Sequence, residues 1–110
     1  MFKIITITAA LLLSFSNTVF AENHASEALK HANMAVAEGK AGKSEALVDH
    51  AGKALEHTLA GALVAKGTAK NHLEAGAKEL EEAIDHGNLN HAKEATKHAE
   101  SAIEHIQASK

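Results

Sequence analysis

The chain has 110 residues, enough for one small domain, and it contains no Cys, Pro, Trp, Tyr or Arg. Its 11 lysines and 14 acidic residues give a formal net charge of −3 with histidine neutral. The lack of cysteine excludes a disulfide framework, a zinc–thiolate site and a covalently attached c-type haem. We expect no nucleic-acid partner, because an acidic chain without arginine binds phosphate poorly and has few aromatic rings for base stacking.

The first 21 residues have the organisation of a secretory signal peptide. Lys3 supplies a positive start, an apolar run follows from Ile4 to Phe15, and Val19-Phe20-Ala21 has the small-x-small pattern of a signal peptidase site. The run is too short to span about 30 Å of hydrocarbon. We therefore expect cleavage after Ala21, so that residues 1–21 are a signal peptide and residues 22–110 form the functional domain.

Residues 22–110 are rich in helix-forming residues. Alanine occupies 21 of these positions, and proline is absent. Four helices are predicted, at about residues 24–38, 44–66, 69–86 and 90–108. Glycines are expected to end the first three helices, at Gly39 and Gly42, Gly67 and Gly87, and Ser44 and Asn90 are the expected N-caps. The short connections favour an all-α, up-down four-helix bundle.

A seven-residue repeat runs through these helices. The segment His24–His31 has the pattern H-A-x-x-A-L-x-H, which recurs at 50–57 and, with Ile for Leu, at 98–105. All nine histidines occupy the first place of the repeat, and Glu79 is the one other residue found there. The fifth place holds Ala or Gly, including Gly61 and Gly76, in every repeat except those that begin at His86 and His105.

The repeat predicts where the histidines lie on each helix. At about 100° per residue, the second, fifth and sixth places form one apolar stripe, and the histidine place lies on its edge. We therefore expect each helix to carry a row of histidines along the seam with a neighbour, where the small residues allow close approach. Few large aliphatic residues and three glycines inside the predicted helices, at 52, 61 and 76, predict a weakly stable fold.

The histidines are the candidate metal ligands. Consecutive histidines in a row are separated by a rise of about 10.5 Å, whereas two ligands of one ion lie only about 3–4 Å apart. A site therefore needs a nearby carboxylate or a histidine from another helix. Glu27, Glu82 and Glu94 have suitable spacing, since each lies four residues before a histidine. The predicted ligands are these three glutamates and His24, His31, His50, His57, His72, His86, His91, His98 and His105.

The ligand types favour Cu(II), with Ni(II), Zn(II) and Co(II) as alternatives, because imidazole suits these ions. Met34 is the one sulfur ligand after residue 21, and the lack of carboxylate clusters argues against Ca²⁺ and Mg²⁺. No metalloprotease, Glu-x-x-His or nucleophile motif indicates an enzyme. The lack of aromatic residues after residue 21 also disfavours a b-type haem pocket.

The repeats resemble those of the small metal-binding protein family, which consists of exported, histidine-rich bacterial proteins. The residues that carry the resemblance are 24–31, 50–57, 80–87 and 95–105. The resemblance implies a small periplasmic helical bundle that binds several divalent ions, Cu(II) foremost, and that buffers or scavenges them.

Two other functions are compatible with the sequence. A structural or pH-responsive helical protein would use the same histidines as titrating groups, since imidazole titrates near a pKa of about 6.5. A lipid-surface protein is disfavoured, because residues 22–110 lack Trp, Phe and Arg, so no stable membrane association is expected after signal removal.

A new amino terminus would add a further candidate site. Cleavage after Ala21 leaves the sequence Glu22-Asn23-His24, in which the free amine, two amides and the third-position imidazole form a square-planar nitrogen site. Cu(II) and Ni(II) favour this geometry.

Overall fold

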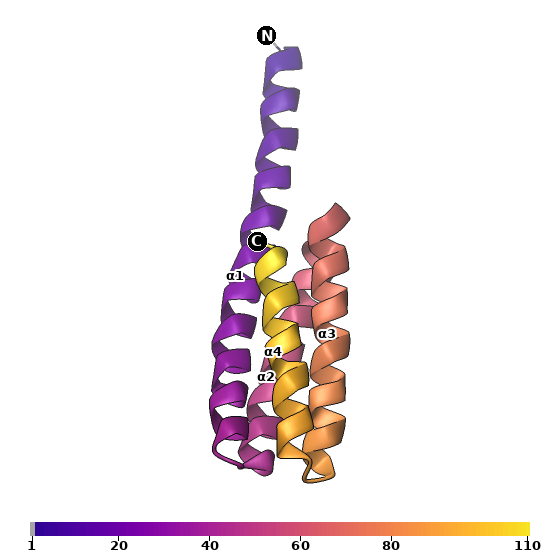
Figure 1. The fold of residues 1–110 in the computed structure, drawn as a ribbon. Helices are drawn as coiled ribbons and strands as arrows, with labels where there is room; N and C mark the ends of the chain where they lie inside the picture. Colours follow the sequence, from indigo (N-terminus) through magenta and orange to yellow (C-terminus); the bar gives the residue numbers. More distant parts are fainter. Residues whose placement is uncertain (1) are drawn as a thin grey trace.

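The computed structural model describes the backbone of residues 2–110 and the side chains of residues 18–110. Its helices are α1 (Phe2–Lys40), α2 (Ser44–Val64), α3 (Gly67–Asn88) and α4 (Ala92–Ala108). Successive helices run antiparallel, and each packs against the helix before or after it (Figure 1). Contacts between α1 and α4 close the bundle. The predicted all-α four-helix bundle is confirmed.

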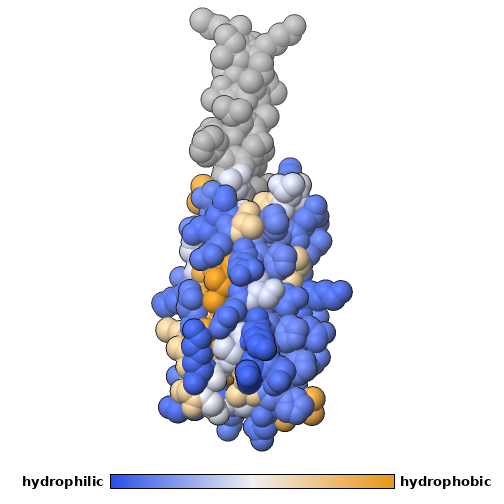
Figure 2. Space-filling model, in the orientation of Figure 1, coloured by the Kyte–Doolittle hydropathy of each residue, from blue (hydrophilic) through white to orange (hydrophobic). Residues whose placement is uncertain are grey.

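The predicted signal peptide falls largely outside the described side chains, which begin at residue 18. Cleavage after Ala21 and the division at residue 22 therefore stay predictions. Within the described residues, no helix combines the length and the apolar character needed to span a membrane. Figure 2 shows that hydrophilic residues cover most of the bundle surface in that view.

Residues in the left-handed conformation end two of the helices. Gly42 follows α1 with φ of 76°, and Asn90 follows α3 with φ of 61°. After each of them the chain closes a Schellman motif. The Lys43 amide donates to the Glu38 carbonyl over 2.9 Å, and the His91 amide donates to the His86 carbonyl over 2.9 Å. These turns reverse the chain within a few residues and set α1 against α2 and α3 against α4.

Three of the four glycines that were expected to end helices do not end them. Gly67 is the first residue of α3 rather than the end of α2, which stops at Val64. Gly39 and Gly87 lie inside helices, at contacts where a side chain would collide with a neighbouring helix. An added Cβ at Gly39 would lie 2.6 Å from the Leu47 side chain, and one at Gly87 would lie 2.5 Å from a Val48 methyl group. Packing, rather than helix termination, therefore requires these glycines.

Neither predicted N-cap serves as one. Ser44 is the first residue of α2 and is buried, and the cap residue before it makes no side-chain hydrogen bond. Asn90 belongs to the end of α3, because its left-handed backbone completes the turn described above. The capping residue of α4 is instead His91, again without a side-chain cap bond.

The core is thin and rich in alanine. Alanines from all four helices are fully buried. Among the side chains of residues 18–110, the large aliphatic residues that reach full burial are Leu47, Leu73, Leu80 and Ile106. Small residues bring the helices close together. An added Cβ at Gly61 would lie 3.3 Å from the His24 Cβ. The close approach predicted from the fifth place of the repeat is therefore confirmed.

Candidate metal centre

The histidine rows meet inside the two helical hairpins of the bundle, α1–α2 and α3–α4. Every contact between histidine rings in the described residues lies within one hairpin. Each joins the two helices of that hairpin, except that His86 contacts His91, which caps α4. Eight of the nine histidines are half-buried, and His91 is exposed. The sequence prediction of histidines at the edge of the apolar stripe is therefore confirmed, and the structure adds which neighbour each row faces.

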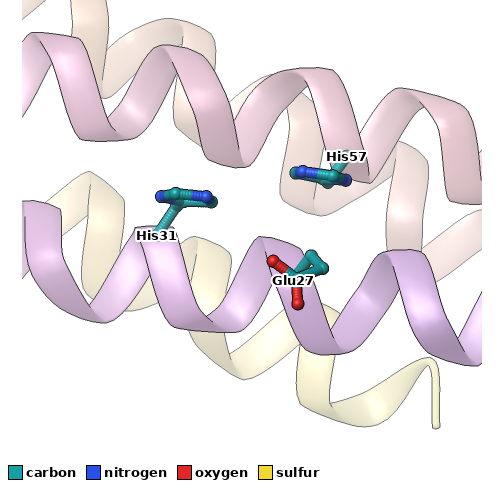
Figure 3. A group of neighbouring side chains, drawn as sticks. All are labelled: Glu27, His31 and His57. Carbon is teal, nitrogen blue, oxygen red and sulfur yellow. The ribbon is translucent and has the colours of Figure 1, made fainter.

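The first cluster lies in the α1–α2 hairpin and consists of Glu27, His31 and His57 (Figure 3). Glu27 and His31 share one face of α1 because they are four residues apart. His57 comes from α2, and its ring stacks on that of His31 with centroids 5.8 Å apart and an interplanar angle of 6°. One potential ligand atom from each residue lies within 4.8 Å of the other two.

The second cluster lies in the α3–α4 hairpin and consists of Glu82, His86 and His98. Glu82 precedes His86 by four residues on α3, and His98 crosses from α4. The rings of His86 and His98 stack with centroids 5.1 Å apart and an interplanar angle of 10°. The ligand atoms again lie within 4.8 Å of one another.

The chemistry of both clusters fits a divalent cation. Two imidazoles and a carboxylate form a ligand set that Zn(II) and related ions use, with bonds of about 2 Å. The present spacing requires a small side-chain movement to bring the donor atoms to about 3–4 Å from each other. Since the ligands come from two helices, a bound ion would join those helices.

An unpaired nitrogen in each cluster supports this fit. Within the described part of the chain, the Nδ1 atoms of His31 and His86 are buried and lack a hydrogen-bond partner. A buried polar atom without a partner costs free energy, which a bound cation or water would remove. His50 Nδ1, which lies between the same two helices as His31, is also buried and lacks a hydrogen-bond partner.

The electrostatic setting keeps one of these ligands neutral. Burial lowers the pKa of His31 below its ordinary value of 6.5, and the nearby His57 and Lys53 lower it further, while Glu27 opposes them. A neutral imidazole is the form that binds a metal ion. His31 is therefore ready to act as a ligand without first losing a proton near neutral pH.

In each hairpin, the histidine that comes from the second helix also makes a polar contact with a residue outside its cluster. In α1–α2, the Nδ1 atoms of His24 and His57 lie 3.3 Å apart. In α3–α4, His98 Nδ1 lies 2.8 Å from Glu79 Oε2, and both side chains are about one-third exposed. The sequence marked Glu79 as the exception in the histidine place but did not predict this contact. Its position in the repeat, opposite a histidine row, is the signal that could have found it.

The remaining predicted ligands lie outside the two clusters. His72 and His105 face each other across α3–α4 with ring centroids 6.1 Å apart. The ring centroids of His50 and His31 lie 6.3 Å apart in a stacked arrangement, and those of His91 and His86 lie 6.0 Å apart. Glu94 is exposed on α4 and belongs to neither cluster.

The fold and its clusters define a small all-α protein in which half-buried histidines and neighbouring carboxylates are suited to binding metal ions. Residues 1–109 match the family described as small metal-binding protein. The chain therefore belongs to the small metal-binding protein family. No individually curated protein gives a significant match.

Proposed function

We propose that the protein binds divalent metal ions after export to the periplasm and buffers or scavenges them there, with Cu(II) preferred over Ni(II), Zn(II) and Co(II). One observation carries the proposal: each hairpin places a Glu-x-x-x-His pair from one helix opposite a histidine from the other. Membership of the small metal-binding protein family supports metal binding as the general role.

The preference for Cu(II) rests on the type of donor atom. Nitrogen donors predominate in both histidine seams, and a given nitrogen site binds Cu(II) more tightly than the other divalent ions of the series. Sulfur contributes little, because Met34 is the one sulfur-containing residue between residues 22 and 110. The proposed role is reversible binding of an ion, which requires no catalytic group.

Buffering rather than permanent storage fits the position of the sites. The clusters lie in the seams between two helices and remain partly open to solvent, since their histidines are half-buried. An ion can therefore reach and leave the ligands without unfolding of the core. Additional histidine pairs, such as His72 and His105, supply weaker positions for further ions.

Calorimetric titration with each ion, combined with elemental analysis of the saturated protein, tests the proposal. We expect at least two bound ions at about pH 7.5, and weaker binding below about pH 6 because protons compete for imidazole. Glu82→Gln should weaken binding, whereas Glu94→Gln is a matched control with the same charge change outside the clusters. A protein that shows no saturable binding would instead support the structural or pH-responsive role.

Comparison of the ions in one competition experiment tests the preference. Cu(II) should displace Zn(II), Co(II) and Ni(II) from the protein when each is supplied at equal concentration. Retention of Zn(II) in the presence of Cu(II) would contradict the copper preference and would leave metal binding itself intact. Recovery of the protein from the periplasmic fraction, with Glu22 as the first residue, would establish export and cleavage.

A further inference from the structure

The two hairpins contain equivalent clusters with one chemical difference. Each residue of the first cluster has a counterpart in the second: Glu27 corresponds to Glu82, His31 to His86, and His57 to His98. The neighbouring ring contacts also correspond. The His31 ring contacts the His50 ring, and the His86 ring contacts the His91 ring. The bundle therefore contains the same ligand arrangement twice.

The difference lies beside the histidine that crosses from the second helix. His57 Nδ1 faces His24 Nδ1 at 3.3 Å, whereas His98 Nδ1 faces Glu79 Oε2 at 2.8 Å. His24 and Glu79 hold corresponding positions of the repeat, one turn before Glu27 and Glu82 respectively. One hairpin thus offers an imidazole to this nitrogen, and the other offers a carboxyl group.

A carboxylate at this place changes what the crossing histidine can do. A carboxylate accepts a hydrogen bond and cannot donate one when ionised, so Glu79 requires the proton of His98 to be on Nδ1. That leaves the Nε2 lone pair for a metal ion, fixes the orientation of the ring and raises its basicity. His24 imposes no such choice, since an imidazole both donates and accepts.

We propose, on the basis of the proposed metal-binding function, that Glu79 is a positioning residue that makes the α3–α4 centre the tighter of two non-equivalent metal centres. In the α1–α2 hairpin, His24 replaces the carboxylate, and His57 must select one tautomer when an ion binds. This selection reduces the affinity of the α1–α2 centre.

Non-equivalent centres serve a metal buffer. Loss of a carboxylate that orients a ligating histidine typically weakens metal binding by about 10–100-fold. Two centres whose metal affinities differ by this factor fill at different free-metal concentrations. Together they buffer a wider concentration range than two identical centres do. The duplication supplies the pair of sites, and the residue at one place of the repeat sets their order of filling.

Zn(II) titration of the wild-type protein and three variants tests the proposal. We expect two tight binding events of unequal affinity in the wild type. Glu79→Gln should weaken the tighter event by about 10-fold or more, and Glu79→Asp should weaken it less, because a carboxylate remains. His24→Glu, which places a carboxylate in the first hairpin, should tighten the weaker event.

Glu81→Gln provides the control, since it removes the same charge from an exposed position of α3. NMR of the imidazole nitrogens provides an independent readout: His98 should carry its proton on Nδ1 in the wild type and lose this preference in Glu79→Gln. The proposal is overturned if Glu79→Gln behaves like Glu81→Gln, or if the two binding events are equal in the wild type. Failure of the wild type to bind Zn(II) at all would overturn the proposed function as well.

Discussion

Bound metal should stabilise this fold by an amount comparable to that of one buried leucine. Both clusters take their ligands from two helices, so the folded protein binds an ion far more tightly than the unfolded chain does. At a free ion concentration of about 100 times Kd, one site adds about 2.7 kcal/mol to the free energy of unfolding. For a domain of this size, that corresponds to roughly 10–20 °C in the melting temperature.

The variant Leu80→Ala provides the scale for this effect. Leu80 is fully buried in a core with few other large side chains, and its truncation should cost about 2–5 kcal/mol. In EDTA the variant should therefore melt well below the wild type or fail to fold. Saturating Zn(II) should recover much of this loss, because one or two bound ions supply free energy of the same order.

Far-UV circular dichroism is the suitable assay, because the chain has no Trp or Tyr to report unfolding by fluorescence. Melting curves are recorded for the wild type and Leu80→Ala, each in EDTA and in excess Zn(II). Interhelical ligation couples metal binding to folding. Identical melting temperatures in EDTA and Zn(II) for both proteins would therefore show that no ion joins the helices.

Three further predictions follow from particular residues. Burial lowers the pKa of His31, so the unfolded chain binds protons more readily than the folded protein does. The free energy of unfolding of the metal-free protein, measured with urea, should therefore decrease as the pH falls below about 6.5. An unchanged free energy of unfolding at lower pH would contradict this prediction. Gly39→Ala should destabilise the protein by about 1–3 kcal/mol because of overlap with α2 and α4. Gly52→Ala should stabilise the protein by about 0.5–1 kcal/mol, since an added Cβ there meets no atom within 4 Å. A higher melting temperature for Gly39→Ala than for Gly52→Ala would contradict the close helix contact at Gly39. If the exported protein begins at Glu22, it should show a square-planar Cu(II) spectrum that His24→Ala or one added N-terminal residue abolishes, and survival of that spectrum in the extended protein would exclude the terminal site.

The sequence repeat predicted the architecture of the histidine rows well. All nine histidines occupy one place of the repeat at the edge of an apolar stripe, and eight of them are half-buried in the seams between helices. Periodicity determines which face of a helix a residue occupies, so this part of the structure followed from spacing alone. Glu27 and Glu82 were likewise predicted from their distance of four residues to a histidine.

The pairing between helices could not be predicted in the same way. Each row borders a neighbouring helix, and the repeat is equally compatible with either neighbour. The choice depends on the close contacts that the chain makes in three dimensions, such as Gly61 against His24 and Gly76 against Ile106. Glu94 shows the same limit, since it has the spacing of a helper carboxylate but lies outside both clusters.

Helix ends were the least predictable local feature. Gly39 and Gly87 were expected to stop helices, but tertiary packing needs them inside α1 and α3. Asn90 instead adopts the left-handed conformation that ends α3. A single sequence does not distinguish a glycine required for close packing from one required for a positive φ, because both roles depend on the absence of a side chain.

Assignment of the first ligands to bind a metal ion distinguishes two interhelical centres from dispersed binding. In a Zn(II) titration followed by NMR of the imidazole nitrogens, His31, His57, His86 and His98 should change with the first two equivalents. His72 and His105, which lack a nearby cluster carboxylate, should respond only to later additions. Equal, simultaneous changes in all nine histidines from the first addition would contradict the account, because they would show dispersed binding rather than two interhelical centres.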